Sequence, residues 1–129
     1  IVQAGGDQQK EQEAFIAQLY DVCLERVPDE AGLVDWLEII AQGSQTGELI
    51  VGGFLNSQEF SGREFTDAEY VTLAYQAFFG REPESAGLTY WQEQLQNGLS
   101  RDELQGLLAR SAEFAQRCAT LGISPCSGD

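Results

Sequence analysis

An eleven-residue pattern occurs twice in the chain and constrains the fold more than any other feature. It reads R-x-P-[DE]-x-A-G-L-x-x-W, first from Arg26 to Trp36 and again, 55 residues later, from Arg81 to Trp91. A pattern with tryptophan, proline and glycine at fixed places is too long to arise by chance, so the sequence contains a duplication. Because one short unit cannot enclose a core alone, we expect the two copies to pack on each other.

The repeated pattern is typical of a tight corner between two helices. The residue before a proline disfavours helix and ends the preceding one, while proline fits the first position of the next helix. The arginine then lies at a helix C-terminus and the acid in a first turn, where each complements the helix dipole. A glycine inside the second helix costs about 1 kcal/mol relative to alanine, which indicates close approach of the preceding helix. The corner residues are Arg26, Pro28, Asp29, Gly32 and Trp36, then Arg81, Pro83, Glu84, Gly87 and Trp91.

Two readings of the corner remain open at this point. In the first, its residues only join helices, and the two tryptophans, Trp36 and Trp91, are equivalent core residues on apolar helix faces. In the second, arginine, acid and tryptophan form a ligand site. Corner residues of these types most often serve the fold, so the structural reading is favoured.

The charge balance restricts the partners of the chain. Its 129 residues suit one domain, and 43% apolar residues are enough for a globular core. With 21 acidic and 7 basic residues the net charge is −14, which repels nucleic acid and anionic membrane surfaces. No apolar run reaches the length of a membrane-spanning helix. Since the sequence does not begin with methionine, we expect it to be a processed or excised fragment of a longer protein.

The histidine and cysteine content limits the possible chemistry. The sequence has no histidine, which excludes Ser-His and Cys-His catalysis. The three cysteines lack the paired spacing of a zinc site. Cys118 and Cys126 bracket a proline and could form a disulfide in an oxidising compartment. Cys23 falls on an apolar helical face, so we interpret it as buried rather than as a reactive thiol.

Hydrophobic periodicity predicts an all-α fold of about six or seven helices, with no segment showing strand alternation. We expect a linker and the start of the first helix in residues 1–14, a two-repeat helical domain in 15–121 and a C-terminal tail in 122–129. The repeats cover about 15–63 and 70–117 and form a pseudo-symmetric bundle. The expected helices run from Gln8 to Glu25 or Arg26, Pro28 to Gln42, Thr46 or Gly47 to Leu55, a turn capped by Ser57, Thr66 or Asp67 to Gly80, Pro83 to Asn97, from Ser100 onward, and Ser111 to Thr120.

The two copies resemble the DUF4214 family of bacterial domains of unknown function. Its repeats read roughly L-Y-x-x-x-L-x-R-x-P-D-x-x-G-x-x-x-W, followed by G-F-L-x-S-x-E-F. The first copy matches at Leu19-Tyr20, Leu24 and the corner, then from Gly53 to Phe60; the second matches at Tyr75, Phe79, its corner and Ser111 to Phe114. The second copy departs from the pattern with Leu107-Leu108-Ala109-Arg110. A more distant similarity links the corner to phycobilisome linker domains.

This resemblance implies a helical module of secreted and surface-attached bacterial proteins, often beside calcium-binding repeats and sometimes in glycosyltransferases. It implies no catalytic residues and an extracellular or cell-surface location.

Acidic and aromatic residues are the two kinds of candidate ligand group in the sequence. Acid pairs such as Asp29/Glu30 and Asp102/Glu103 have the side chains of glycosidase carboxylates or calcium ligands, but no feature of the sequence supports either role: they fall at helix starts and lack the spacing of a calcium loop. We therefore expect no cofactor and no metal site, although the overall acidity could attract calcium diffusely. Exposed aromatic rings can stack on sugars, and Tyr90 is the best candidate because it lies off the apolar face.

The sequence therefore favours a noncatalytic protein-interaction or scaffold module, and not an enzyme. The alternative is a glycan-binding module attached to an adhesin or a carbohydrate-active enzyme. The expected partner is another protein or a surface glycan, with no nucleic acid and no membrane insertion, and the oligomeric state stays open. The expected contact surface is Asp29, Glu30, Glu84 and Tyr90.

Overall fold

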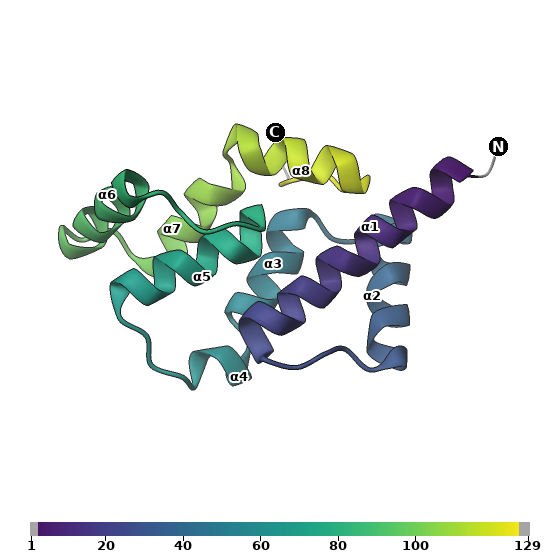
Figure 1. The fold of residues 1–129 in the computed structure, drawn as a ribbon, viewed down its shortest axis with the longest axis horizontal. Coiled ribbons are helices and arrows are strands. Elements are labelled where there is room, and N and C mark those ends of the chain that lie inside the picture. The colour runs from purple at the N-terminus through teal and green to yellow at the C-terminus, as the bar shows by residue number, and fades with distance from the viewer. Residues whose placement is uncertain (1–2, 127–129) are drawn as a thin grey trace.

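The computed structural model describes residues 3–126, and over this range the chain forms eight α-helices and no strand (Figure 1). The all-α prediction is confirmed, with one or two more helices than expected. The helix α1 (Gln3–Leu19) continues into a π-helical turn, η1 (Tyr20–Leu24). The others are α2 (Glu30–Gln42), α3 (Gly47–Leu55), α4 (Gln58–Ser61), α5 (Asp67–Phe79), α6 (Ser85–Gln96), α7 (Arg101–Ala109) and α8 (Ala112–Leu121).

Short polar side chains set most helix starts. Thr66 and Ser100 each open a capping box, in which the hydroxyl oxygen accepts from the backbone N–H three residues on and a glutamate accepts from the cap N–H. Ser57 and Ser111 cap α4 and α8 through the same hydroxyl bond, each at 3.2 Å. These starts fall at the predicted positions because a cap depends on residues close in sequence, and each one stabilises by about 1 kcal/mol.

The prolines of the corner lie further from the helix than expected. Pro28 and Pro83 precede the N-cap residues Asp29 and Glu84, which have extended backbone, so neither proline occupies the first helical position. The Asp29 carboxylate accepts a hydrogen bond of 2.9 Å from the Gly32 N–H. The acid therefore acts as a cap rather than as a first-turn residue, because a carboxylate there satisfies a free amide of the helix.

The core lies between the first helices of the two copies, α1 with η1 and α5, and the helices α3, α7 and α8. By contrast, α2 packs on α1 and α6 packs on α5, and Figure 1 shows these two corner helices at opposite ends of the molecule. No side chain of α6 is fully buried. The largest side chains with almost no exposure are Phe78, Phe114, Ile16, Leu19, Ile50, Leu104, Val51, Val71, Cys23 and Cys118.

Residues near both ends of the described range make more contacts with the helical domain than expected. Helix α1 begins at Gln3 rather than Gln8, and the Gln12 side chain donates to the Leu121 carbonyl at 2.8 Å. In the expected tail, Ile123 is buried. The carbonyls of Ser124 and Pro125 accept from the first two N–H groups of α3 at 2.7 and 2.8 Å. Residues 1–2 and 127–129 of the expected linker and tail lie outside the described residues.

Candidate functional site

The arginine of the first corner joins two segments of its copy. Arg26 faces the Glu59 carboxylate through Nη2–Oε1 at 3.3 Å and Nε–Oε2 at 3.5 Å. Its guanidinium also lies over the Tyr20 ring, 5.1 Å from the centroid. The arginine was expected only to complement a helix dipole; instead it bridges the corner to α4.

The second corner repeats this pairing in a tighter form. Arg81 donates to Glu113 through Nε at 2.7 Å and Nη2 at 2.8 Å, which is a bidentate contact, and lies 5.4 Å from the Tyr75 centroid. The hydrogen bond from Arg81 lowers the pKa of the Glu113 carboxyl, and the same bond raises the pKa of Arg81. Sequence reasoning missed both pairs, although Glu59 and Glu113 occupy the same place in the repeated Ser-x-Glu-Phe segment.

The preceding helix approaches the corner glycines closely, as predicted, and the group that it brings there is a tyrosine hydroxyl. A Cβ on Gly32 would lie 2.9 Å from the Tyr20 hydroxyl and 2.7 Å from Asp29 Oδ1, so a side chain there would clash. At Gly87 the nearest atom is the Tyr75 hydroxyl at 3.4 Å, an ordinary contact. The close approach is therefore strict in the first copy and looser in the second.

The tryptophans pack against the core without being fully inside it. Both are half-buried, so the prediction of equivalent core residues needs correction. The reason is that α2 and α6 lie on the outside of the bundle. Trp36 contacts Phe54 with a centroid distance of 5.2 Å, whereas the Trp91 Nε1–H donates to the Tyr75 hydroxyl at 3.0 Å.

A second arginine of each copy also supports the fold and was not singled out from the sequence. Arg63 Nη1 donates to the Cys23 carbonyl at 3.0 Å, and Arg117 Nη1 donates to the carbonyls of Phe78 at 2.8 Å and Ala77 at 3.2 Å. Each guanidinium thus binds backbone at the end of the first helix of its own copy. The sequence could have indicated Arg63 and Arg117, because each lies six residues after the serine of the Ser-x-Glu-Phe segment in its copy.

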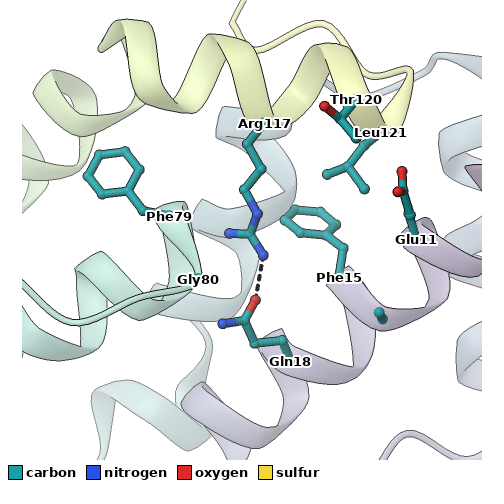
Figure 2. A pocket seen from close by; sticks show the side chains of 9 residues that line it. Glu11, Phe15, Gln18, Phe79, Gly80, Arg117, Thr120 and Leu121 are labelled. Carbon is teal, nitrogen blue, oxygen red and sulfur yellow. Dashed lines mark hydrogen bonds between the residues drawn. The ribbon is translucent and has the colours of Figure 1, made fainter.

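Beside Arg117 lies an open groove of about 560 Å³, which we call the Arg117 groove. Figure 2 shows the guanidinium between Gln18, whose Oε1 accepts from Nη2, and the ring of Phe15, 5.0 Å from its centroid. Burial lowers the pKa of Arg117, yet an arginine stays protonated. The groove is lined by Glu11, Ala14, Phe15, Gln18, Phe79, Gly80, Arg117, Thr120 and Leu121.

All three cysteines are free thiols in the structure, so the possible Cys118–Cys126 bridge is not present in it. Cys118 is fully buried beside α3, where a Cβ on Gly47 would lie 2.6 Å from its Sγ. Backbone hydrogen bonds to α3 hold the tail in place of a disulfide. Cys23 is buried as expected, and burial raises the pKa of both Cys23 and Cys118 to about 12.

The expected contact residues are exposed but are not brought together. Asp29, Glu30, Glu84 and Tyr90 all face solvent, with Tyr90 53% exposed. The first two lie at the start of α2 and the others on or next to α6, at the opposite end of the molecule (Figure 1). Asp102 and Glu103 lie in the first turn of α7, where Glu103 completes the capping box.

Two further properties of residues 3–126 bear on the candidate sites. No three or more cysteine and carboxylate side chains are grouped so that they could hold a metal ion. None of the helices in this range has the length and hydrophobicity needed to cross a membrane.

The family model of the domain of unknown function DUF4214 matches residues 5–63 and, again, residues 54–118. Two successive matches fit the duplication in the sequence. The match carries no information on phycobilisome linker domains, so that similarity stays a prediction. Searches of curated proteins and of solved structures give no match. Because the family model covers most of the chain, the chain belongs to the DUF4214 family of domains of unknown function.

Proposed function

We propose that this chain is a noncatalytic contact module of a secreted or cell-surface bacterial protein. The observation that carries the proposal is that the repeated corner residues make their contacts within the chain. The corner arginines, Arg26 and Arg81, bind glutamates of the same copy, and the corner glycines admit a tyrosine. The repeated arginines and glycines therefore hold the helices of the corner together. A partner would then bind the exposed side chains of the surface.

The charge of that surface supports a basic protein partner. The chain carries 21 acidic residues and 7 basic ones. Four of its arginines, Arg26, Arg63, Arg81 and Arg101, already face carboxylates within the chain. The remaining excess of negative charge attracts lysine- and arginine-rich surfaces and raises the rate of encounter with them.

The test is capture of partners from the secreted and surface fraction of the native host, followed by crosslinking. A triple variant, Asp29→Asn, Glu30→Gln and Glu84→Gln, removes three exposed acids while keeping an N-cap at position 29. The matched control, Asp21→Asn, Glu38→Gln and Glu93→Gln, changes the net charge equally at other exposed sites. We expect capture to weaken in the first variant and to fall with salt. Catalytic turnover that is lost on changing a single acid would contradict the proposal.

Glycan binding is the second candidate, and the exposed ring of Tyr90 favours it. This ring lies edge-on to Trp91 at a centroid distance of 4.9 Å, on a helix with no fully buried side chain. Sugar stacking needs an aromatic face but no hydroxyl. Binding on a glycan array should therefore disappear with Tyr90→Ala and persist with Tyr90→Phe, while an array with no bound glycan would exclude this candidate.

A further inference from the structure

The two copies differ at the position that faces their second arginine. In the first copy, Glu25 Oε2 lies 2.8 Å from Arg63 Nη2. Gly80 takes the equivalent place in the second copy, 55 residues on, and brings no side chain. Both residues end their helix with positive φ, 56° at Glu25 and 73° at Gly80. The second copy thus has the arginine and the same backbone turn, but lacks the carboxylate.

Gly80 directly faces the arginine that is left without an acid. A Cβ built on Gly80 would lie 3.2 Å from Arg117 Nη2 and 3.5 Å from Gln18 Nε2. Among the side chains that the structure describes, no carboxylate forms an ion pair with Arg117, whereas Arg63 has Glu25. Arg110, the other arginine without an ion pair among the described residues, is exposed, whereas Arg117 is half-buried.

The contacts of Arg117 leave two of its N–H groups without an acceptor among the described residues. Its Nη1 donates to two carbonyls at the end of α5, and Nη2 donates to Gln18. An arginine has five N–H donors. The Nε–H and one N–H of Nη2 remain, and these two groups form the same edge that Arg81 uses to hold Glu113. A carboxylate is the group that this edge binds best.

Apolar side chains lie next to this edge in the groove. The Phe15 ring supports the guanidinium, and Figure 2 shows Phe79 and Leu121 on either side of it. At about 560 Å³, the groove is within the size range of small-ligand sites. A fitting ligand therefore combines one carboxylate with an apolar group a few atoms away.

We propose that the Arg117 groove binds the C-terminal carboxylate of a partner polypeptide whose last side chain is apolar. The terminal carboxylate accepts from the N–H groups of Arg117 that have no acceptor in the chain, much as Glu25 accepts from Arg63 in the first copy, and the last side chain packs against Leu121. A chain end brings these two groups on one residue and enters an open groove end-on, whereas an internal acid needs the flanking chain to cross the groove. This proposal rests on the contact-module function proposed above.

The charges around the groove restrict which residues can precede the C-terminal residue of the partner. The carboxylate of Glu11 lies at the groove and is exposed. With the overall negative charge it repels further acids near the bound terminus and attracts basic residues. We therefore expect lysine or arginine shortly before the C-terminal residue of the partner.

The experiment is a titration of the whole chain, followed by NMR of backbone amides and of the arginine Nε–H groups. The probe is a peptide with two lysines, two glycines, a leucine and a C-terminal phenylalanine, compared with the same peptide as a C-terminal amide. We expect saturable shifts at Arg117 Nε–H, Gln18 and Gly80 with the free acid. Binding of the amide should be weaker by about tenfold or more, because it loses a charge-assisted pair.

Variants separate the site from general charge effects. Gly80→Glu recreates the acid of the first copy and should abolish binding while Arg117 keeps its bonds to α5. Arg110→Gln removes an equal charge on α7, outside the groove, and should bind as the wild type does. Arg117→Gln should also lose binding, and its amide spectrum shows whether the fold is kept.

The outcomes are distinct. Equal affinity for acid and amide, undiminished binding by Gly80→Glu, or shifts that avoid Arg117 Nε–H would each overturn the proposal. Acetate that reproduces every shift at the same concentration would reduce the groove to a general anion site and would also overturn it. Because the probe is a defined peptide, these results do not depend on whether the chain captures a host partner.

Discussion

Arginine has roles in this chain that lysine could not take over. Arg81 holds Glu113 through two parallel hydrogen bonds and lies over the ring of Tyr75. Arg117 binds two carbonyls and one amide oxygen with the same planar group. Both arrangements need several donors fixed in one plane, which a single ammonium does not provide.

The Arg81–Glu113 pair makes stability depend on pH in a defined direction. The pKa of Glu113 is lowered in the folded state from the ordinary value of 4.5. Its contribution is therefore full above that value and is lost as the pH falls through the lower, folded pKa. We expect Glu113→Gln to destabilise at pH 7 by at most about 1 kcal/mol, since the pair is partly exposed. Urea unfolding at pH 7 and pH 3 checks this, and an undiminished difference at pH 3 would argue against the pair.

The thiols provide a second test at this scale. Cys23 and Cys118 are fully buried with pKa values raised to about 12, whereas Cys126 is half-exposed. A thiol reagent at pH 8 should modify Cys126 rapidly and the other two only on unfolding. Mass mapping of the non-reduced protein should show no Cys118–Cys126 linkage; finding that linkage would restore the disulfide expected from the sequence.

At the scale of helices, local chemistry is predictable and contact between distant segments is not. Thr66, Ser100 and Gly43 mark helix ends correctly because a cap involves residues within a few positions. The π-helical turn at Tyr20–Leu24 interrupts the regular α-helical period that the sequence pattern predicts for the whole first helix. The glutamate partners of Arg26 and Arg81 lie more than thirty residues away, and only their equal positions in the two copies could have suggested them.

Parts of the candidate site were also unpredictable because they depend on contacts between distant segments. Exposure of the acids and of Tyr90 followed from helical faces, but the separation of α2 and α6 depends on how the copies pack. The Arg117 groove combines α1, α5 and α8, so no single segment reveals it. Half-burial of Trp36 and Trp91 likewise depends on the outer position of their helices.

The two corner glycines allow a matched prediction for helix packing. Gly32→Ala places a Cβ 2.7 Å from Asp29 Oδ1, whereas Gly87→Ala meets only the Tyr75 hydroxyl at 3.4 Å. The second variant should gain helix propensity and stabilise by up to about 1 kcal/mol. The first should be less stable than the second, because the Asp29 carboxylate and the Tyr20 hydroxyl must shift, and the shift of Asp29 weakens its N-cap hydrogen bond to the N–H of residue 32. The measurement is the midpoint of thermal unfolding of each variant relative to wild type. Equal shifts of the two midpoints in the same direction would contradict the difference in packing.

At the scale of the whole molecule, the copies share one core. Helices α1 and η1 of the first copy contact α5 and α8 of the second, and α3 contacts α7. Residues 1–63 and 64–129, expressed separately, should therefore lack cooperative thermal unfolding and should regain it when mixed. A single fragment that unfolds cooperatively by itself would show that one copy can form a core alone.

The central claim is that the arginines and glycines of the repeated corner shape the molecule and do not themselves bind the partner. Arg26 and Glu59 allow a direct test, because exchanging the two residues, Arg26→Glu with Glu59→Arg, keeps an ion pair of the same charge at this place. We predict that the exchanged variant folds and captures host partners as strongly as wild type. A variant that keeps the helical fold and cooperative unfolding but loses capture would show that Arg26 binds the partner, which would contradict the account.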